Sequence, residues 1–108
     1  MKTLLPITAV ALAACFVTAG ARAADTEAMK KAGCLACHSD DKKVVGPSYK
    51  DVAKKYKGQP DAVAHLMEKV RKGGSGVWGP VPMSPNPPSK ISDADLKAAV
   101  EYIMSLAK

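Results

Sequence analysis

The sequence is poor in aromatic residues, with one Phe, one Trp and three Tyr among 108 residues. A domain of this size builds only a marginal hydrophobic core, and large rings normally supply much of the buried apolar area. Cysteine and histidine are also scarce, at three and two residues. A zinc site needs about four ligands, so a zinc-stapled fold is disfavoured. A stable fold would therefore gain from a further apolar body in the core.

The sequence also lacks strand patterns, internal repeats and any sign of a second domain. One apolar run stands out, from Leu4 to Val17, behind Lys2 and ahead of small residues. It is too short for a comfortable membrane span, and no other run of span length follows. Ala21-Arg22-Ala23 matches the A-x-A pattern of signal peptide cleavage. We therefore expect residues 1–23 to be a signal peptide and residues 24–108, 85 residues, to be one exported domain.

An alternative interpretation of the leader concerns Cys15. Leu12-Ala13-Ala14-Cys15 resembles the lipobox at which bacterial lipoproteins are cleaved and acylated. Phe16 and Val17 continue the apolar run, however, where a lipoprotein usually has a polar tether. A lipid-anchored form remains the alternative, and we expect contact with a membrane only in that form.

The most informative motif is Cys34-Leu35-Ala36-Cys37-His38. C-x-x-C-H is the signature of covalent c-type haem attachment, because two closely spaced thiols reach the vinyl groups on one edge of the ring. The adjacent histidine is then placed to ligate the iron. A thioredoxin-like pair, a zinc site and a disulfide are the alternatives, but no βαβ pattern surrounds the motif and further zinc ligands are missing. We predict one haem c, held by Cys34 and Cys37 with His38 on the iron. Such haem is attached outside the cytoplasm, which in a bacterium means the periplasm.

Apolar periodicity predicts an all-α domain of four short helices. The first is capped by Asp25 or Thr26, the third opens at Pro60 and Asp61, and the last is capped by Ser92. Between the third and the last helix, Gly, Pro and Ser are frequent, which predicts a long irregular loop. The helices are expected to end near residues 31, 57, 72 and 107, and the loop to span residues 74–90.

A loop of that length usually carries function, and this one contains the methionine that we expect as the second iron ligand. Met83 lies between prolines, which stiffen the backbone around a weakly binding thioether. Met29 is too close to the haem motif, whereas Met67 and Met104 lie on or beside apolar helix faces and are expected in the core. An ordinary loop methionine remains the alternative. His65 lies off the apolar face of its helix, so we expect it to face solvent.

Three motifs are specific in combination: Gly33-Cys34-x-x-Cys37-His38, Val45-Gly46-Pro47-x-Tyr49-Lys50-Asp51-Val52-Ala53 and Gly76-Val77-Trp78-Gly79-Pro80-Val81-Pro82-Met83. Together they resemble the motifs of the small bacterial class I cytochromes c, most closely the cytochrome c-551/c-552 group of periplasmic electron carriers. The likeness covers residues 25–108 and implies the small class I cytochrome c fold, about four short helices packed around one covalently bound haem.

The resemblance also implies roles around the haem. The carbonyl group of Pro47 would accept the Nδ1 hydrogen of His38, which orients the imidazole. Trp78 would donate its indole N–H to a haem propionate, with plain core packing as the alternative. Asn86 would hydrogen-bond near the Met83 sulfur.

The chain departs from the family pattern at three places. Lys69 stands where many relatives have an arginine near a propionate, and a lysine lacks the planar fork for a bidentate contact. The connection Pro87-Pro88-Ser89-Lys90 is slightly longer than usual. Tyr102 occupies a position where tryptophan is common. Neither iron ligand is affected.

These features predict a one-electron carrier of relatively high potential. Histidine and methionine fill both axial positions, so iron has no open site for a substrate and we expect no enzyme activity. Two alternatives remain: an enzyme or sensor in which Met83 is off the iron, and a fixed haem subunit of a larger complex.

Charge and family resemblance suggest the partners. Residues 24–108 contain 14 of the 16 basic residues and all 10 acidic residues, so their net charge is +4. Lysines near the haem motif are expected to steer a monomer toward acidic redox proteins, not toward nucleic acid. The resemblance implies partners such as a haem nitrite reductase, a terminal oxidase or a quinol-oxidising complex.

Overall fold

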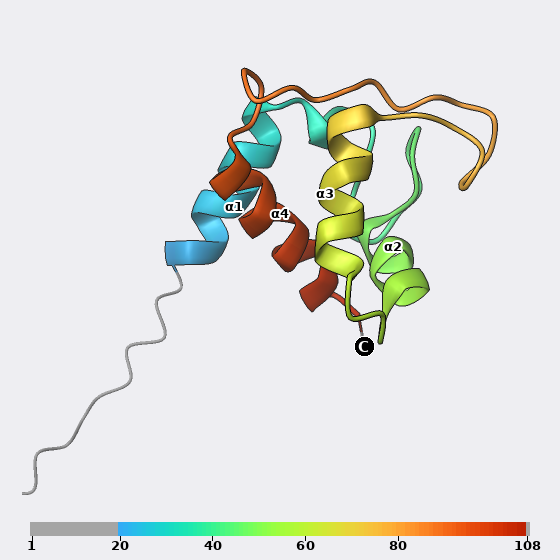
Figure 1. Ribbon diagram of the computed structural model, residues 1–108, viewed down its shortest axis with the longest axis horizontal. Helices are drawn as coiled ribbons and strands as arrows, with labels where there is room; N and C mark the ends of the chain where they lie inside the picture. Colours follow the sequence, from blue (N-terminus) through green and yellow to red (C-terminus); the bar gives the residue numbers. More distant parts are fainter. Residues whose placement is uncertain (1–19, 108) are drawn as a thin grey trace, which may run out of the picture.

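The computed structural model describes the backbone of residues 20–107 and the side chains of residues 26–107. Residues 20–107 contain no strand, only two isolated antiparallel bridges, His38 with Lys43 and Gly74 with Met83. The predicted all-α class with four helices is therefore confirmed (Figure 1). In chain order, the elements are α1 (Gly20–Lys31), the 3₁₀ turn η1 (Cys34–Ala36), α2 (Tyr49–Tyr56), α3 (Ala62–Lys72) and α4 (Asp93–Ser105).

The N-terminal helix is longer than predicted. It begins at Gly20, several residues before the expected cap at Asp25 or Thr26. Alanine has the highest helix propensity, and alanines occupy positions 21, 23 and 24, so the helix extends backward through them. The predicted signal peptide, apart from residues 20–23, and Cys15 lie outside the described residues. No helix within residues 20–107 is long and apolar enough to cross a membrane.

Helix α4 is the central element and packs against α1, α2 and α3 (Figure 1). Its side chains at the spacing i, i+3, i+4 and i+7 are all buried, as the periodicity predicted. A single helix can contact three others in this way because one apolar face spans most of its length. These buried side chains of α4 are Leu96, Ala99, Val100 and Ile103.

Serine hydroxyl groups cap two of the helices. Ser48 Oγ accepts the Asp51 N–H at 3.1 Å at the start of α2, and Ser92 Oγ accepts the Asp95 N–H at 3.2 Å at the start of α4. Each bond satisfies one of the N–H groups that a helix N-terminus leaves without a backbone partner. The Ser92 cap was predicted from the sequence. Helix α3 ends at Lys72, and the N–H of Gly73, which caps it, donates to the Lys69 carbonyl at 2.7 Å.

The two methionines assigned to the core do lie there: Met67 and Met104 are partly buried and pack against the cluster of buried side chains. Met29, which the sequence excludes as a ligand only because it is close to the haem motif, belongs to that cluster and is 2% exposed. His65 is half-buried, with its ring centroid 5.3 Å from that of Tyr56. The expected solvent-facing histidine is therefore partly covered by a neighbouring ring.

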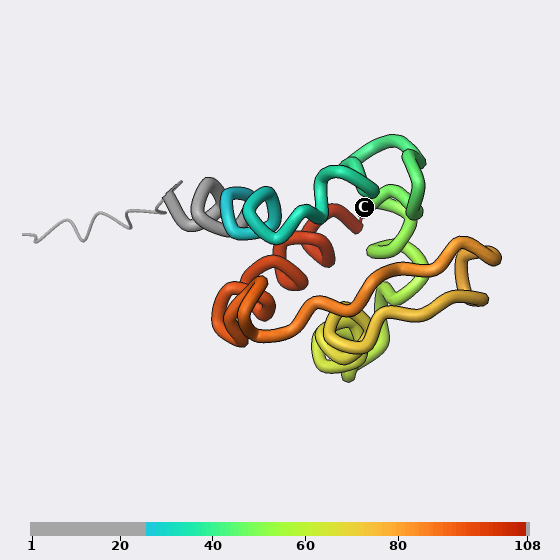
Figure 2. Tube along the Cα trace, turned by 90° about the horizontal axis from the view of Figure 1, so that it is seen from above, coloured from blue at the N-terminus to red at the C-terminus, as the bar shows by residue number. Residues whose placement is uncertain are grey.

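The connection between α3 and α4 forms the long irregular loop that the sequence predicted. Gly74 and Met83 exchange two backbone hydrogen bonds, with N to O distances of 3.0 and 2.8 Å, so the loop doubles back on itself. Seen from above, the segment 34–47 and the loop 73–85 run along opposite sides of the same end of the molecule (Figure 2). The haem motif therefore lies on the segment 34–47 and Met83 on the loop 73–85, and these two segments form the two walls of this end of the fold.

Candidate haem-binding site

The 3₁₀ turn η1 brings the two thiols of the haem motif to one side. A 3₁₀ helix has three residues per turn, so positions i and i+3 lie above one another. The Cys37 N–H donates to the Cys34 carbonyl at 3.1 Å and closes this turn. Both cysteines are free thiols; Cys37 is exposed and Cys34 is half-buried, and burial raises the pKa of the Cys34 thiol. Two thiols on one face at this spacing suit attachment to a single edge of a planar ligand.

His38 is held by the backbone in one tautomer. Its Nδ1 lies 2.8 Å from the Pro47 carbonyl oxygen, the contact that the family resemblance implied. A carbonyl oxygen can only accept, so Nδ1 carries the hydrogen and Nε2 keeps its lone pair. A histidine that binds a metal ion through one ring nitrogen usually donates the hydrogen of its other ring nitrogen to a carbonyl group, a carboxylate or a water molecule. The side chain is therefore prepared to bind a metal ion through Nε2.

Two neighbours restrict the imidazole further. The ring of Tyr49 stacks on it, with centroids 5.2 Å apart and an interplanar angle of 19°. Tyr49 is buried, and this burial raises the pKa of its phenol, so the hydroxyl stays protonated. Gly46 approaches the ring so closely that a Cβ atom there would lie 2.5 Å from His38 Cε1. Glycine is thus required at position 46 by the space that the imidazole occupies.

Met83 lies on the loop wall, partly buried, with its main chain tied to the end of α3. Beyond the paired bonds to Gly74, the backbone passes so near Gly73 that a Cβ atom on Gly73 would collide with the Met83 carbonyl oxygen. Gly73 has φ 65° and ψ −151°, a conformation that glycine adopts easily. The main chain of Met83 is therefore packed directly on the C-terminal end of α3.

Asn86 has other partners than expected, whereas the expected bond from Trp78 to a haem propionate stays a prediction. Trp78 is 41% exposed near the tip of the loop, with the Lys55 ammonium 5.4 Å from its ring centroid, so its ring does not pack in the protein core. Asn86 is buried, and its Nδ2 donates to the carbonyl oxygens of Val70 at 3.2 Å and Ser84 at 3.0 Å. Both hydrogens of this amide are used on the backbone. In place of the expected contact with the Met83 sulfur, the structure gives Asn86 a role in holding the loop.

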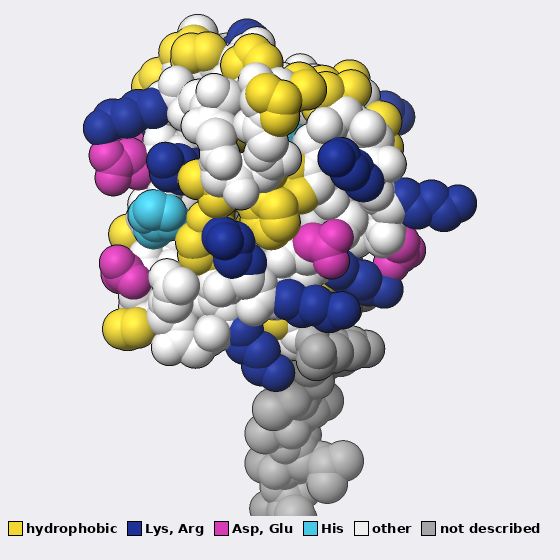
Figure 3. Space-filling model, turned by 90° about the vertical axis from the view of Figure 1, so that its right-hand side faces the viewer, with side chains coloured by type: hydrophobic (Ala, Val, Ile, Leu, Met, Phe, Trp, Pro, Cys, Tyr) yellow, Lys and Arg dark blue, Asp and Glu magenta, His cyan; other side chains and the backbone are white. Residues whose placement is uncertain are grey.

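The surface around these residues fits a large apolar ligand. In the described part of the chain, the large apolar side chains that remain exposed all lie in two segments, 35–45 and 77–81, which follow Cys34 and precede Met83. Seen from the side of α2 and the loop tip, hydrophobic side chains gather on the upper part of the face, with lysine and arginine around them (Figure 3). Together with two thiols on one face and a prepared imidazole, this surface fits a haem. The exposed side chains are Leu35, Val44, Val45, Val77, Trp78 and Val81.

Arg71 is the residue that sequence reasoning missed. Its guanidinium group donates to the carbonyl oxygens of Asn86 at 2.9 Å and Ile91 at 2.7 Å, and contacts the Asp93 carboxylate at 2.6 Å. One signal was available: it is the single arginine after the predicted cleavage site, in a chain that otherwise uses lysine. Lys69, which attracted attention as a departure from the family pattern, has an exposed side chain.

Comparison with known proteins gives the family. A family model described as cytochrome c matches residues 18–107. Cytochrome c2 of Rubrivivax gelatinosus is 51% identical over 82 residues, covering 76% of this chain and 96% of the relative. Cytochrome c-552 of Hydrogenobacter thermophilus is 46% identical over 106 residues, covering 98% of this chain and 99% of the relative. The crystal structure of wild-type Nitrosomonas europaea cytochrome c552 superposes with a TM-score of 0.69 at 47% identity, covering 75% of this chain and 98% of that one.

The family model extends over the whole described fold and includes the segments that form the two walls of the site. The C-x-x-C-H turn, the oriented histidine and the apolar surface agree with the covalently bound haem c of that family. The chain therefore belongs to the cytochrome c family, as a small class I member that carries electrons on a covalently bound haem c.

Proposed function

We propose that this protein is a periplasmic one-electron carrier whose haem iron is bound by His38 and Met83, with thioether links from Cys34 and Cys37. The observation that carries the proposal is the 2.8 Å contact between His38 Nδ1 and the Pro47 carbonyl oxygen. That contact leaves Nε2 as the donor atom. Removal of residues 1–23 on export would leave residues 24–108 as the working domain.

The side chains proposed to meet the iron determine what the site does. Haem supplies reversible one-electron chemistry at its iron. Hydrogen bonding from Nδ1 to Pro47 makes the imidazole of His38 a stronger donor. The thioether of Met83 is a poor donor to ferric iron and raises the reduction potential. With both axial positions filled, a substrate has no place on the iron, which is why we propose a carrier and not an enzyme.

Surface charge supports encounters with acidic partners. Seven lysines that flank the haem motif or lie on α2 are exposed; among them, Lys50 pairs with Asp41, and Lys55 lies over Trp78. Clustered positive charge speeds encounter with an oppositely charged surface. We propose acidic redox proteins as partners, such as a haem nitrite reductase, a terminal oxidase or a quinol-oxidising complex, each met by a monomer. The lysines are Lys30, Lys31, Lys42, Lys43, Lys50, Lys54 and Lys55.

The ligand set is tested by replacing Met83 with alanine in the haem-loaded protein. The wild type is expected to show the weak long-wavelength absorption band of methionine bound to ferric iron, and a positive midpoint potential. Met83→Ala should lose the band and bind carbon monoxide readily in the ferrous state. Met67→Ala, which removes a methionine packed against the core, should keep the band. A wild type that is high-spin and binds carbon monoxide would instead indicate an enzyme or sensor.

A further inference from the structure

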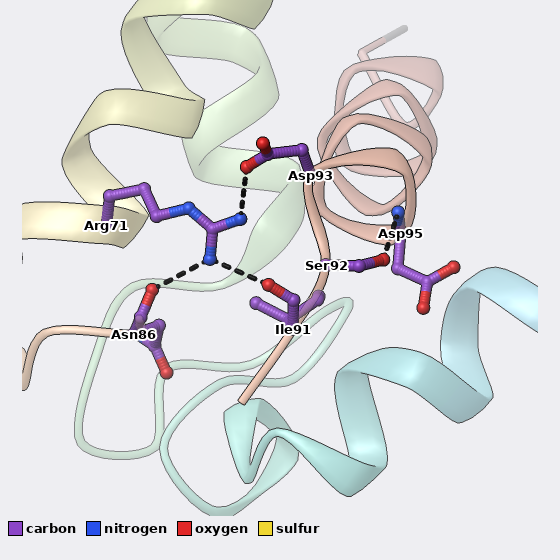
Figure 4. Close-up of polar contacts among 6 residues, drawn as sticks. All are labelled: Arg71, Asn86, Ile91, Ser92, Asp93 and Asp95. Carbon is purple, nitrogen blue, oxygen red and sulfur yellow. Dashed lines mark hydrogen bonds and ion pairs between the residues drawn. The ribbon is translucent and has the colours of Figure 1, made fainter. Parts of the chain in front are cut away.

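Arg71, in the last turn of α3, joins three separate parts of the chain. Its side chain is only 19% exposed, and its guanidinium group lies between Asn86, Ile91 and Asp93 (Figure 4). Asn86 and Ile91 are the two ends of the connection that contains Pro87 and Pro88, and Asp93 begins α4. A planar guanidinium with several donors can serve three acceptors at once. One side chain therefore closes the connection and attaches it to α3.

Asn86 continues this attachment toward Met83. Its backbone N–H points at the Val70 and Arg71 carbonyl oxygens, at 3.1 and 3.3 Å, and its Nδ2 reaches Val70 and Ser84. The last carbonyl groups of a helix have no partner within the helix. Those of α3 are used here to hold a loop. Ser84, the residue that follows Met83, is thereby fixed to the end of α3.

The main chain of Met83 is consequently held from both sides. On one side, its N–H and carbonyl groups are bonded to Gly74; on the other, Asn86 holds Ser84, and Arg71 holds Asn86. Movement of Met83 away from this position would break the bonds of Asn86, which Arg71 reinforces by a charge-assisted hydrogen bond to the Asn86 carbonyl group. The chain of contacts from Arg71 to Met83 is continuous.

We infer that Arg71 is a positioning residue for the axial bond of Met83: it holds the loop so that the thioether stays on the iron. The inference rests on the proposed ligation by Met83. It explains why the single arginine of the domain stands at this position. A lysine offers one compact ammonium group, which cannot reproduce three contacts in a fork-shaped geometry.

The test uses the haem-loaded protein and the variants Arg71→Gln and Arg71→Lys. The matched control is Lys72→Gln, which removes a cation from the same helical turn, where Lys72 pairs at 2.5 Å with the exposed Glu68. The first measurement is the rate at which imidazole replaces methionine on ferric iron. The second is hydrogen exchange of the Met83 and Gly74 amide groups. Both are made at a temperature where every variant is fully folded.

Arg71→Gln should bind imidazole about tenfold faster than the wild type, since loss of a charged donor commonly costs at least that factor. Its Met83 and Gly74 amides should also exchange faster. In both measurements, Arg71→Lys should lie between Arg71→Gln and the wild type, and Lys72→Gln should match the wild type. If Arg71→Gln lowers the melting temperature while both measurements equal those of Lys72→Gln, Arg71 only stabilises the fold and the inference is wrong. If Arg71→Gln does not fold, Arg71→Lys carries the same comparison.

Failure of the proposed ligation would look different. A wild type without the methionine–iron band, or a Met83→Ala variant that keeps it, would remove the ligand itself and the inference with it. The inference alone would be wrong if the wild type shows the methionine–iron band and Met83→Ala loses it, but Arg71→Gln behaves like the Lys72→Gln control.

Discussion

The replacement of Gly46 by alanine tests how closely the backbone approaches the imidazole of His38, the proposed iron ligand. The added Cβ atom would lie 2.5 Å from His38 Cε1, 2.9 Å from Nδ1 and 3.1 Å from Nε2, all shorter than an ordinary van der Waals contact. The imidazole cannot simply turn away, because Pro47 and Tyr49 hold it. Either the ring or the backbone of the segment must therefore move.

Two effects on stability oppose each other at this position. Gly46 does not have a positive φ angle, so an alanine would fit the backbone and, by restricting the unfolded chain, would stabilise by about 0.4–1 kcal/mol. Overpacking of a filled site costs about 1–3 kcal/mol, and loss of the His38–Pro47 hydrogen bond adds about 0.5–1.5 kcal/mol. The clash should prevail, with a net loss of about 2 kcal/mol. For a domain of this size, each kcal/mol lowers the melting temperature by about 4–8 °C.

The assay is thermal unfolding of the haem-loaded Gly46→Ala protein, followed by circular dichroism and haem absorbance. NMR detection of the His38 Nδ1 hydrogen reports on the hydrogen bond to Pro47. Gly58→Ala is the control: Gly58 has φ 84°, and a Cβ atom added there would have no neighbour within 4 Å, so only backbone strain of about 1 kcal/mol is expected. The control should lose stability and keep the Nδ1 signal of the wild type.

The reasoning is refuted if Gly46→Ala is as stable as the wild type, or more stable, with an unchanged Nδ1 signal. That result would mean that the backbone around Gly46 moves with little loss of folding free energy. The orientation of His38 would then be set by its bond to the iron and not by the surrounding protein.

Three further predictions follow from the sequence and the fold. Ser92→Ala should destabilise the protein by about 1 kcal/mol in chemical unfolding, because α4 loses its cap bond to Asp95, whereas the exposed loop variant Ser75→Ala should change stability by less than about 0.5 kcal/mol. The double variant Cys34→Ala, Cys37→Ala should be largely unfolded without haem, since so small and ring-poor a core is marginal; full native helicity by circular dichroism would contradict this. Electron transfer to an acidic redox partner should slow as salt is added, because exposed lysines are screened; stopped-flow rates that stay flat would argue against steering.

Local spacing along the chain was enough to predict the site motif and most of the helices. The two thiols and the histidine are adjacent in sequence, so chain geometry alone places them together. The apolar periodicity of α2, α3 and α4 and the Ser92 cap are equally local properties, and the structure confirms them. The start of α1 was predicted too late, because a cap signal at Asp25 or Thr26 was given more weight than the helix propensity of the alanines before it.

Contacts between distant residues required the tertiary structure. Arg71 reaches acceptors 15, 20 and 22 residues away, and Asn86 turns its amide to the end of α3 instead of to Met83; neither partner follows from spacing. The sequence by itself determined that the fold is all-α and that a long loop carries Met83, and it predicts haem attachment at Cys34 and Cys37. Only the packing of that loop on α3 decided which side chains hold it, because such contacts exist only once the intervening chain has closed.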